Sequence, residues 1–194
     1  LADFLSLRKG REAAEAAFRE AMEQLPYSTK IPFALGALCE RHKDNAKARQ
    51  VYEAVIKEHQ KKSAGLDAQV KIAQLDFSAG RQNEAERRLA EVLRENPRSA
   101  EGLILQGKMA LIKRSGKDAV QVFRTVLRDQ PEFAHVQYLL GQAYIMTGEP
   151  QLARESFERA VALQPDAVES SLALATLESQ SGQAPRARAR LLEI

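Results

Sequence analysis

The sequence predicts an all-α fold in which antiparallel helical hairpins repeat along the chain. Apolar residues recur at helical spacing through most of the 194 residues, and glycines and prolines interrupt the runs. Pro97, Pro131 and Pro165 follow one another at equal intervals, and Ala85, Ala119 and Ala153 repeat with the same period. Because a period of this length is typical of solenoids, we expect one continuous solenoid domain rather than a single central core.

Residues 134–167 show the unit most clearly. Apolar residues up to Tyr144 form one helical stripe, and Gly148 then ends the first helix at a position suited to a tight turn. Pro150 suits the first turn of a second helix, whose apolar stripe includes Phe157, and Pro165 ends that helix. Two short amphipathic helices joined in this way predict an antiparallel hairpin.

The first two repeats match this unit less closely. Residues 1–28 hold the end of a first helix, a turn at Lys9-Gly10, and a second helix that contains Phe18. In residues 29–62, Cys39 takes the place of Tyr144 and no proline closes the repeat. Residues 63–65 are an insertion, which we expect to form a loop and to be the place where the array bends.

The remaining repeats keep the register. They comprise residues 66–99, 100–133, 134–167 and, as a partial repeat, 168–194, in which Glu178 takes the tyrosine position. In residues 100–133 the glycine Gly116 comes two residues later than Gly148 does, which predicts a longer first helix. In this phase both ends of the chain fall within a repeat, so we expect a fragment of a longer protein.

The repeat resembles the tetratricopeptide repeat (TPR), whose pattern is Leu-Gly, then Tyr, then Ala-x-x-x-Phe, then Pro. Gln137 departs from this pattern, since the family has a tryptophan there. The matching residues are Leu140-Gly141, Tyr144, Ala153, Phe157 and Pro165. The resemblance implies a right-handed superhelix whose first helices line a concave groove, and the composition of the helices resembles bacterial TPR proteins.

Composition and charge disfavour several other classes of function. A net charge of +3 is small for this length, and even residues 29–65 mix eight Lys/Arg with four Asp/Glu, so we expect no nucleic-acid partner. No run of about 18 apolar residues predicts a membrane span. Cys39 alone cannot form an internal disulfide, and the sequence does not decide between the cytoplasm and a bacterial periplasm or envelope.

Catalytic and metal-binding motifs are not found. His42, His59 and His135 share no metal-ligand spacing, and Cys39 occupies a core position, so we expect neither a metal nor a cofactor. The glycines lie at repeat positions rather than in a phosphate-binding loop. We therefore expect a protein that is not an enzyme.

The first helices carry large apolar residues on a second face, beyond the stripe that stacking buries, and such a face needs a partner. TPR domains that bind C-terminal carboxylates use Lys and Asn there, but no first helix in this chain has an Asn. The asparagine ladder of the glycosyltransferase TPR domain is likewise replaced, here by Lys71, Leu105, Leu139 and Ala173. The predicted groove residues are Phe33, Val70, Lys71, Gln74, Phe77, Ile104, Leu105, Lys108, Leu111, Ile112, His135, Tyr138, Gln142, Ile145 and Met146.

The sequence thus predicts a non-catalytic scaffold that binds a peptide or helix of a protein partner in the concave groove. Two alternatives remain open. The chain could form a self-assembling structural array, as a homo-oligomer, or it could be the regulatory arm of a larger enzyme or of an envelope or exopolysaccharide-export complex.

Overall fold

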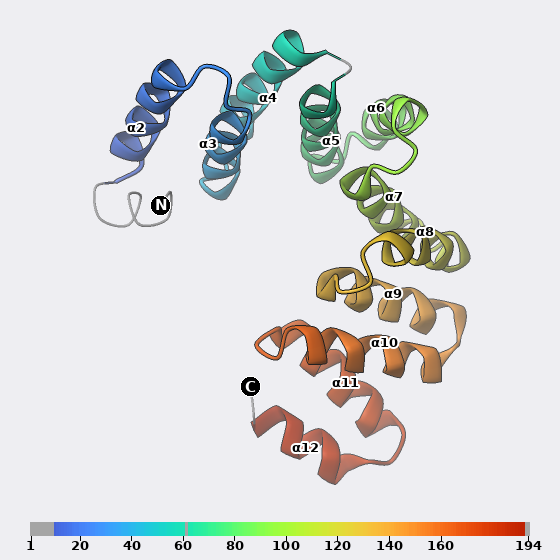
Figure 1. The fold of residues 1–194 in the computed structure, drawn as a ribbon. Helices are drawn as coiled ribbons and strands as arrows, with labels where there is room; N and C mark the ends of the chain where they lie inside the picture. Colours follow the sequence, from blue (N-terminus) through green and yellow to red (C-terminus); the bar gives the residue numbers. More distant parts are fainter. Residues whose placement is uncertain (1–9, 61, 193–194) are drawn as a thin grey trace. The chain divides into compact units, whose positions relative to one another are not determined.

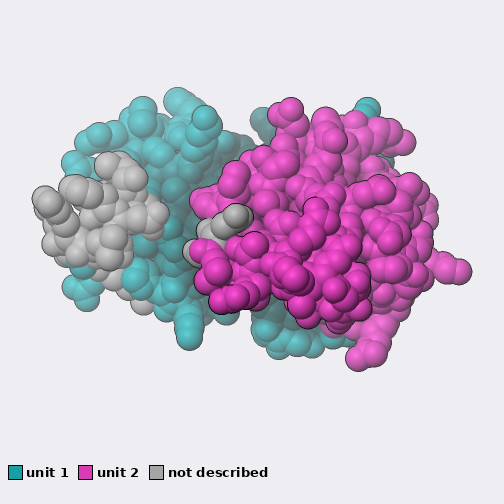
Figure 2. Space-filling model, turned by 90° about the horizontal axis from the view of Figure 1, so that it is seen from below, with its two compact units in different colours: residues 1–99 teal, residues 100–194 magenta. Residues whose placement is uncertain are grey.

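The structure is a computed structural model that describes residues 10–60 and 62–192. The described part of the chain contains eleven helices and no strand, and within each unit every helix packs on the next one in sequence, so the predicted all-α class is confirmed (Figure 1). The chain forms two compact units, residues 1–99 and residues 100–194 (Figure 2). The handedness of the array as a whole stays a prediction.

Unit 1 contains five described helices. They are α2 (Arg11–Gln24), α3 (Lys30–Arg41), α4 (Asn45–His59), α5 (Ser63–Ser78) and α6 (Gln82–Glu95). The core of this unit gathers around Tyr52, which is fully buried together with Cys39 and Ala48. Each helix therefore buries one apolar face against the helix before it or after it in the sequence.

Unit 2 repeats the same arrangement with six helices. They are α7 (Ala100–Ile112), α8 (Gly116–Asp129), α9 (Ala134–Thr147), α10 (Pro150–Leu163), α11 (Val168–Gln180) and α12 (Ala184–Leu192). Phe123 and Phe157 lie in its core, and the first helices α7 and α9 also contact one another. The prediction that Pro150 opens a second helix is confirmed, since it is the first residue of α10.

A small residue on each first helix is matched by a large residue on the second helix of the same hairpin. A Cβ atom built on Gly141 would lie 2.6 Å from Cδ1 of Phe157, and one on Gly107 would lie 2.5 Å from Cζ of Phe123. The close approach therefore requires glycine wherever the partner is an aromatic ring. Where the first helix has alanine at this position, the second helix has leucine. The five pairs are Gly36 with Tyr52, Ala73 with Leu89, Gly107 with Phe123, Gly141 with Phe157 and Ala175 with Leu191.

The turn between the two helices of a hairpin also has a repeated conformation. Gly80, Gly148 and Gly182 share one position of the repeat and have φ angles of 78°, 77° and 75°. Arg114 occupies the same position in residues 100–133 and has a φ of 59°. The prediction of a longer first helix there is wrong, because Gly116 does not form the turn. It is the buried first residue of α8, and α7 ends at Ile112.

The insertion at residues 63–65 is not a loop. It forms the first turn of α5, which begins at Ser63. The preceding turn is tight because Gln60 has a φ of 43°, and a Cβ on Gly65 would lie 2.8 Å from its carbonyl carbon. The chain thus absorbs three extra residues by extending a helix, and α4 still packs against α5.

Candidate functional site

The first helices of unit 2 place predicted groove residues at matching positions of successive repeats. Ile112 at the end of α7 and Met146 near the end of α9 are equivalent, and both are exposed, at 61% and 41%. Ile145, next to Met146, is 46% exposed. Met146 also lies over the start of α8, since its Cγ atom is 3.1 Å from the position of a Cβ on Gly116. These three side chains, which we call the apolar rim, have large apolar surfaces in contact with water.

The first half of α9 carries an aromatic and polar group beside the apolar rim. The Tyr138 ring packs 5.8 Å from the Phe157 ring and 6.4 Å from the His135 ring, measured between centroids. Gln142 donates a hydrogen bond of 2.8 Å from Nε2 to the Tyr138 hydroxyl. The hydroxyl is therefore held in place by a side chain one helical turn further along α9.

Two pKa values in this group are shifted. Burial lowers the pKa of His135, the positive charge of Lys108 lowers it further, and Glu169 opposes both effects. Burial and Glu169 raise the pKa of Tyr138. Both side chains are therefore neutral at pH 7, so they offer hydrogen-bonding groups on a surface that is otherwise apolar.

The remaining predicted residues of α7 contribute less surface. Ile104 and Leu111 are half-buried because they pack against the core of unit 2, and Lys108 is half-buried as well. Leu105 is only 5% exposed. Its assignment to the groove is corrected, because a buried side chain presents no surface to a ligand.

Unit 1 presents less apolar surface at the equivalent positions. The Phe33 ring lies 5.8 Å from the Tyr52 ring and is half-buried, as are Lys71, Gln74 and Phe77. Val70 is 2% exposed and is also removed from the predicted groove. In the described part of unit 1, the strongly exposed large apolar residues lie between α2 and α3 and not on a first helix.

Sequence reasoning missed two exposed residues on α11. Leu172 is 45% exposed and Val168 is 43% exposed. Leu172 lies one repeat period after Tyr138, so continuing the repeat by one unit would have found it. The exposed apolar surface of unit 2 thus includes three first helices, α7, α9 and α11.

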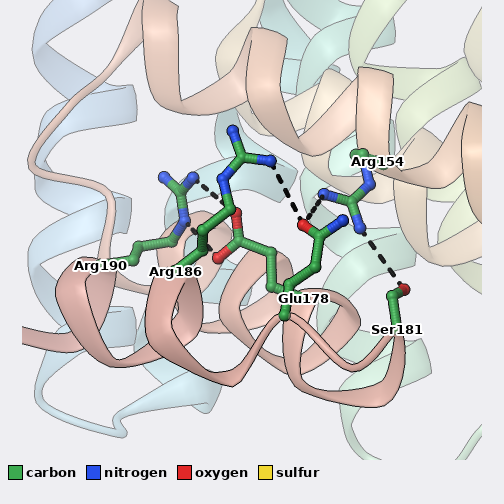
Figure 3. Close-up of polar contacts among 6 residues, drawn as sticks. Arg154, Glu178, Ser181, Arg186 and Arg190 are labelled. Atoms are coloured by element: carbon green, nitrogen blue, oxygen red, sulfur yellow. Dashed lines mark hydrogen bonds and ion pairs between the residues drawn. The ribbon is translucent and has the colours of Figure 1, made fainter.

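A buried carboxylate replaces the tyrosine of the repeat in unit 2. Glu178 is 1% exposed and accepts two hydrogen bonds from Arg190, at 2.9 Å and 3.2 Å (Figure 3). These hydrogen bonds lower the pKa of Glu178, and the charges of Arg190, Arg154 and Arg186 add to this against the opposing effect of burial. The carboxylate therefore ties α11 to α12.

The arginines around Glu178 are themselves bound to neutral acceptors. Gln183, which lies between α11 and α12, accepts from Arg154 at 3.5 Å and from Arg186 at 3.3 Å through Oε1. Arg154 also donates to the Ser181 hydroxyl at 3.4 Å, and Figure 3 shows these groups side by side. The cluster is thus a set of internal contacts that join α10, α11 and α12.

The equivalent position in unit 1 is Asp76, which is 3% exposed at the end of α5. Its Oδ1 atom pairs with Arg49 of α4 and with Arg81, whose Nε lies 2.9 Å away. Arg88 of α6 corresponds to Arg190, yet its Nε lies 3.9 Å from Oδ2 and makes no hydrogen bond. Both units therefore bury an acid at the tyrosine position, but they surround it differently.

Cys39, a further candidate from the sequence, lies at a position that packing explains. Cys39 is fully buried in the core of unit 1. Over the described residues, no cluster of three or more His, Cys, Asp or Glu side chains has a geometry suited to a metal ion. None of the described helices is both long enough and apolar enough to span a bilayer.

Comparison with solved structures supports the fold. Pseudomonas aeruginosa PilF has a TM-score of 0.74 to this chain at 19% identity, with coverage of 95% of this chain and 76% of that one. TTC0263, a TPR protein of Thermus thermophilus, has a TM-score of 0.69 at 22% identity, with coverage of 84% and 88%. MamA from Desulfovibrio magneticus RS-1 has a TM-score of 0.67 at 18% identity, with coverage of 85% and 92%. These identities are low, so the similarity concerns the fold alone.

Comparison at the level of sequence gives the family. No curated protein matches the chain. The family model of the tetratricopeptide repeat matches residues 70–131 and residues 114–168, which together include more than half of the chain. With helical hairpins repeated at a constant interval in the same region, this chain belongs to the tetratricopeptide repeat family.

Proposed function

We propose that this chain is a non-catalytic scaffold that binds a helix or an extended apolar segment of a partner protein on the first-helix face of unit 2. Membership of the TPR family supports the general role, because these repeats typically serve protein interactions. The observation that favours this face is the apolar rim of Ile112, Ile145 and Met146, which stays exposed after each hairpin has buried its core.

The chemistry of the face favours an amphipathic partner. An exposed apolar surface gains free energy when it is covered, at about 25 cal/mol per Å² of apolar area. Gln142 and neutral His135 lie on the same helix and can position polar groups of the partner without charge. A ligand with apolar side chains along one face and polar groups along its edges fits this arrangement.

The test is a binding measurement with peptides selected against the full chain from a display library. Ile112→Glu combined with Ile145→Glu places two charges on the apolar rim at positions that are already exposed, so the fold should be retained. We expect peptide affinity to fall by about tenfold or more, since burying an unpaired carboxylate costs more than about 1.4 kcal/mol. Circular dichroism checks that the variant stays helical.

The matched control is Leu25→Glu, because Leu25 is 59% exposed and lies in unit 1. Its affinity for the selected peptides should remain that of the wild type. Equal affinity of all three proteins would contradict the proposed binding face. Light scattering of the wild type and the double variant across a range of concentrations separates partner binding from self-association through the same residues.

A further inference from the structure

Unit 1 has an open cleft of about 670 Å³ where the start of α4, the end of α5 and the start of α6 meet. Four arginines line it, namely Arg49, Arg81, Arg87 and Arg88. The acidic residues in the lining are Asp76 and Glu84, so the cleft retains two positive charges. This cleft lies wholly within unit 1 and shares no residue with the apolar rim.

Asp76 neutralises only part of this positive charge. Its Oδ1 atom is shared between Arg49 and Arg81, whereas Oδ2 stays 3.9 Å from Nε of Arg88. That nitrogen is buried and has no hydrogen-bond acceptor. Arg87 is exposed and makes no ion pair within the described residues. A buried N–H donor without an acceptor is costly, and it is more so when it belongs to a charged group.

In the equivalent cluster of unit 2, both oxygens of the buried acid accept hydrogen bonds. The longer side chain of Glu178 reaches Arg190 with both oxygens, where Asp76 fails to reach Arg88. Gln183 stands where unit 1 has Arg81, and it accepts hydrogen bonds instead of adding a charge. Arg87 is replaced there by alanine. Both clusters hold more arginines than acids, but the three arginines of unit 2 all donate hydrogen bonds, whereas unit 1 keeps an arginine nitrogen without an acceptor.

The start of α6 adds to the positive potential of the cleft, whereas the start of α4 is capped by the side chain of Asp44, which accepts a hydrogen bond from the backbone N–H of Lys47. Arg81 is the N-cap residue of α6 and its side chain does not cap the helix, so amide groups of the first turn lack a side-chain acceptor. The N-terminus of a helix favours an anion through these amides and through the helix dipole.

We propose that this cleft binds a phosphate group. Guanidinium groups pair with phosphate through parallel hydrogen bonds, and a phosphate monoester with about two negative charges at pH 7 matches the net charge of the lining. No aromatic side chain lines the cleft, so a nucleic-acid base would have no ring to stack on. The phosphate belongs either to a small phosphoester or to a phosphorylated side chain of a partner protein.

Calorimetric titration of the full chain with inorganic phosphate, at constant ionic strength, tests the site. Arg87→Gln removes an exposed arginine and leaves the pairs of Asp76 intact, and we expect it to weaken phosphate binding about tenfold. Lys57→Gln is the matched control, because Lys57 is an exposed cation near the other end of α4, and its affinity should equal that of the wild type.

A third variant tests the charge argument in the opposite direction. Glu84→Gln removes an exposed carboxylate from the lining, so phosphate should bind several times more tightly. Absence of phosphate binding by the wild type would overturn the proposal, and so would equal weakening by Arg87→Gln and Lys57→Gln. Tighter binding of a phosphoserine peptide than of free phosphate would assign the site to a protein partner, and equal binding would assign it to a small phosphoester.

Discussion

The contact between Gly141 and Phe157 provides a sharp test of how the hairpins are held together. Gly141→Ala introduces a Cβ 2.6 Å from Cδ1 and 2.8 Å from Cζ of a ring that is 2% exposed. Such overpacking costs about 1–3 kcal/mol, and the better helix propensity of alanine offsets roughly 1 kcal/mol of this. Because the ring is buried in the core of unit 2 and has little room to move, the overpacking cost should lie in the upper part of this range, and we expect a net loss of about 1–2 kcal/mol of unfolding free energy.

Phe157→Leu is the natural compensating change, since Ala73 and Ala175 are already matched by leucines. Alone, it leaves a space beside Gly141 and should cost about 1–2 kcal/mol, less than the roughly 3–5 kcal/mol typical of Phe→Ala. In the double variant the Cβ of alanine fills that space. The two changes together should therefore cost about 1 kcal/mol, which leaves a coupling energy of about 2 kcal/mol between them.

Urea unfolding followed by far-ultraviolet circular dichroism measures these free energies from the midpoints and slopes. The reference is Ala73→Gly, at the matching position opposite Leu89, which should lose about 1–2 kcal/mol of unfolding free energy through lower helix propensity and the loss of a buried methyl group. Additive effects of Gly141→Ala and Phe157→Leu would refute the reasoning, as would a Gly141→Ala variant more stable than the wild type.

Three further predictions concern buried charge, turn conformation and protonation. Glu178→Gln should destabilise the protein by about 3 kcal/mol at neutral pH because Arg190 loses its charged partner. Thermal melting should show this deficit shrinking as the pH falls from the ordinary glutamate pKa of 4.5 toward the lowered pKa of Glu178 in the folded protein. Gly148→Ala should lower the unfolding free energy by about 1–2 kcal/mol because Gly148 has a φ of 77°. Arg114→Gly, at the matching turn, should leave the unfolding free energy unchanged or raise it, as measured by urea unfolding. His135 has a lowered pKa in the folded protein, so its contribution to stability is complete above pH 6.5 and is lost as the pH falls toward the lowered pKa. In the same melting experiment, the His135→Gln variant should not show this loss of stability.

The repeat period and the packing of the hairpins could be predicted because they depend on residue size and spacing. Glycines, alanines and prolines at one constant spacing give the register of the hairpins, and the helix boundaries follow from it within a few residues. The turn at Arg114 could not be predicted, because an arginine at a positive φ has no distinctive sequence pattern and Gly116 is a misleading neighbour. The helical state of residues 63–65 depends on the tight turn at Gln60, which residue types alone do not indicate.

The candidate surface was predicted in part. Ile112, Ile145 and Met146 are exposed as expected, but Leu105 and Val70 on the same predicted face are buried. A repeat phase identifies which residues share a face, whereas the width of the buried stripe depends on how closely neighbouring helices approach. The arginine cleft of unit 1 joins three helices and depends on the one-carbon difference between aspartate and glutamate, so no local pattern indicates it.

The most direct test of the proposed binding face is a methyl-labelled nuclear magnetic resonance titration with a display-selected peptide. The methyl resonances of Ile112, Ile145 and Met146 should shift as the peptide is added, because these groups become covered. The methyl groups of Ile72, in the core of unit 1, and of Ile56, which packs against that core, serve as internal references, and their resonances should not shift. Binding accompanied by shifts confined to unit 1, with the apolar rim unchanged, would contradict the proposed binding face.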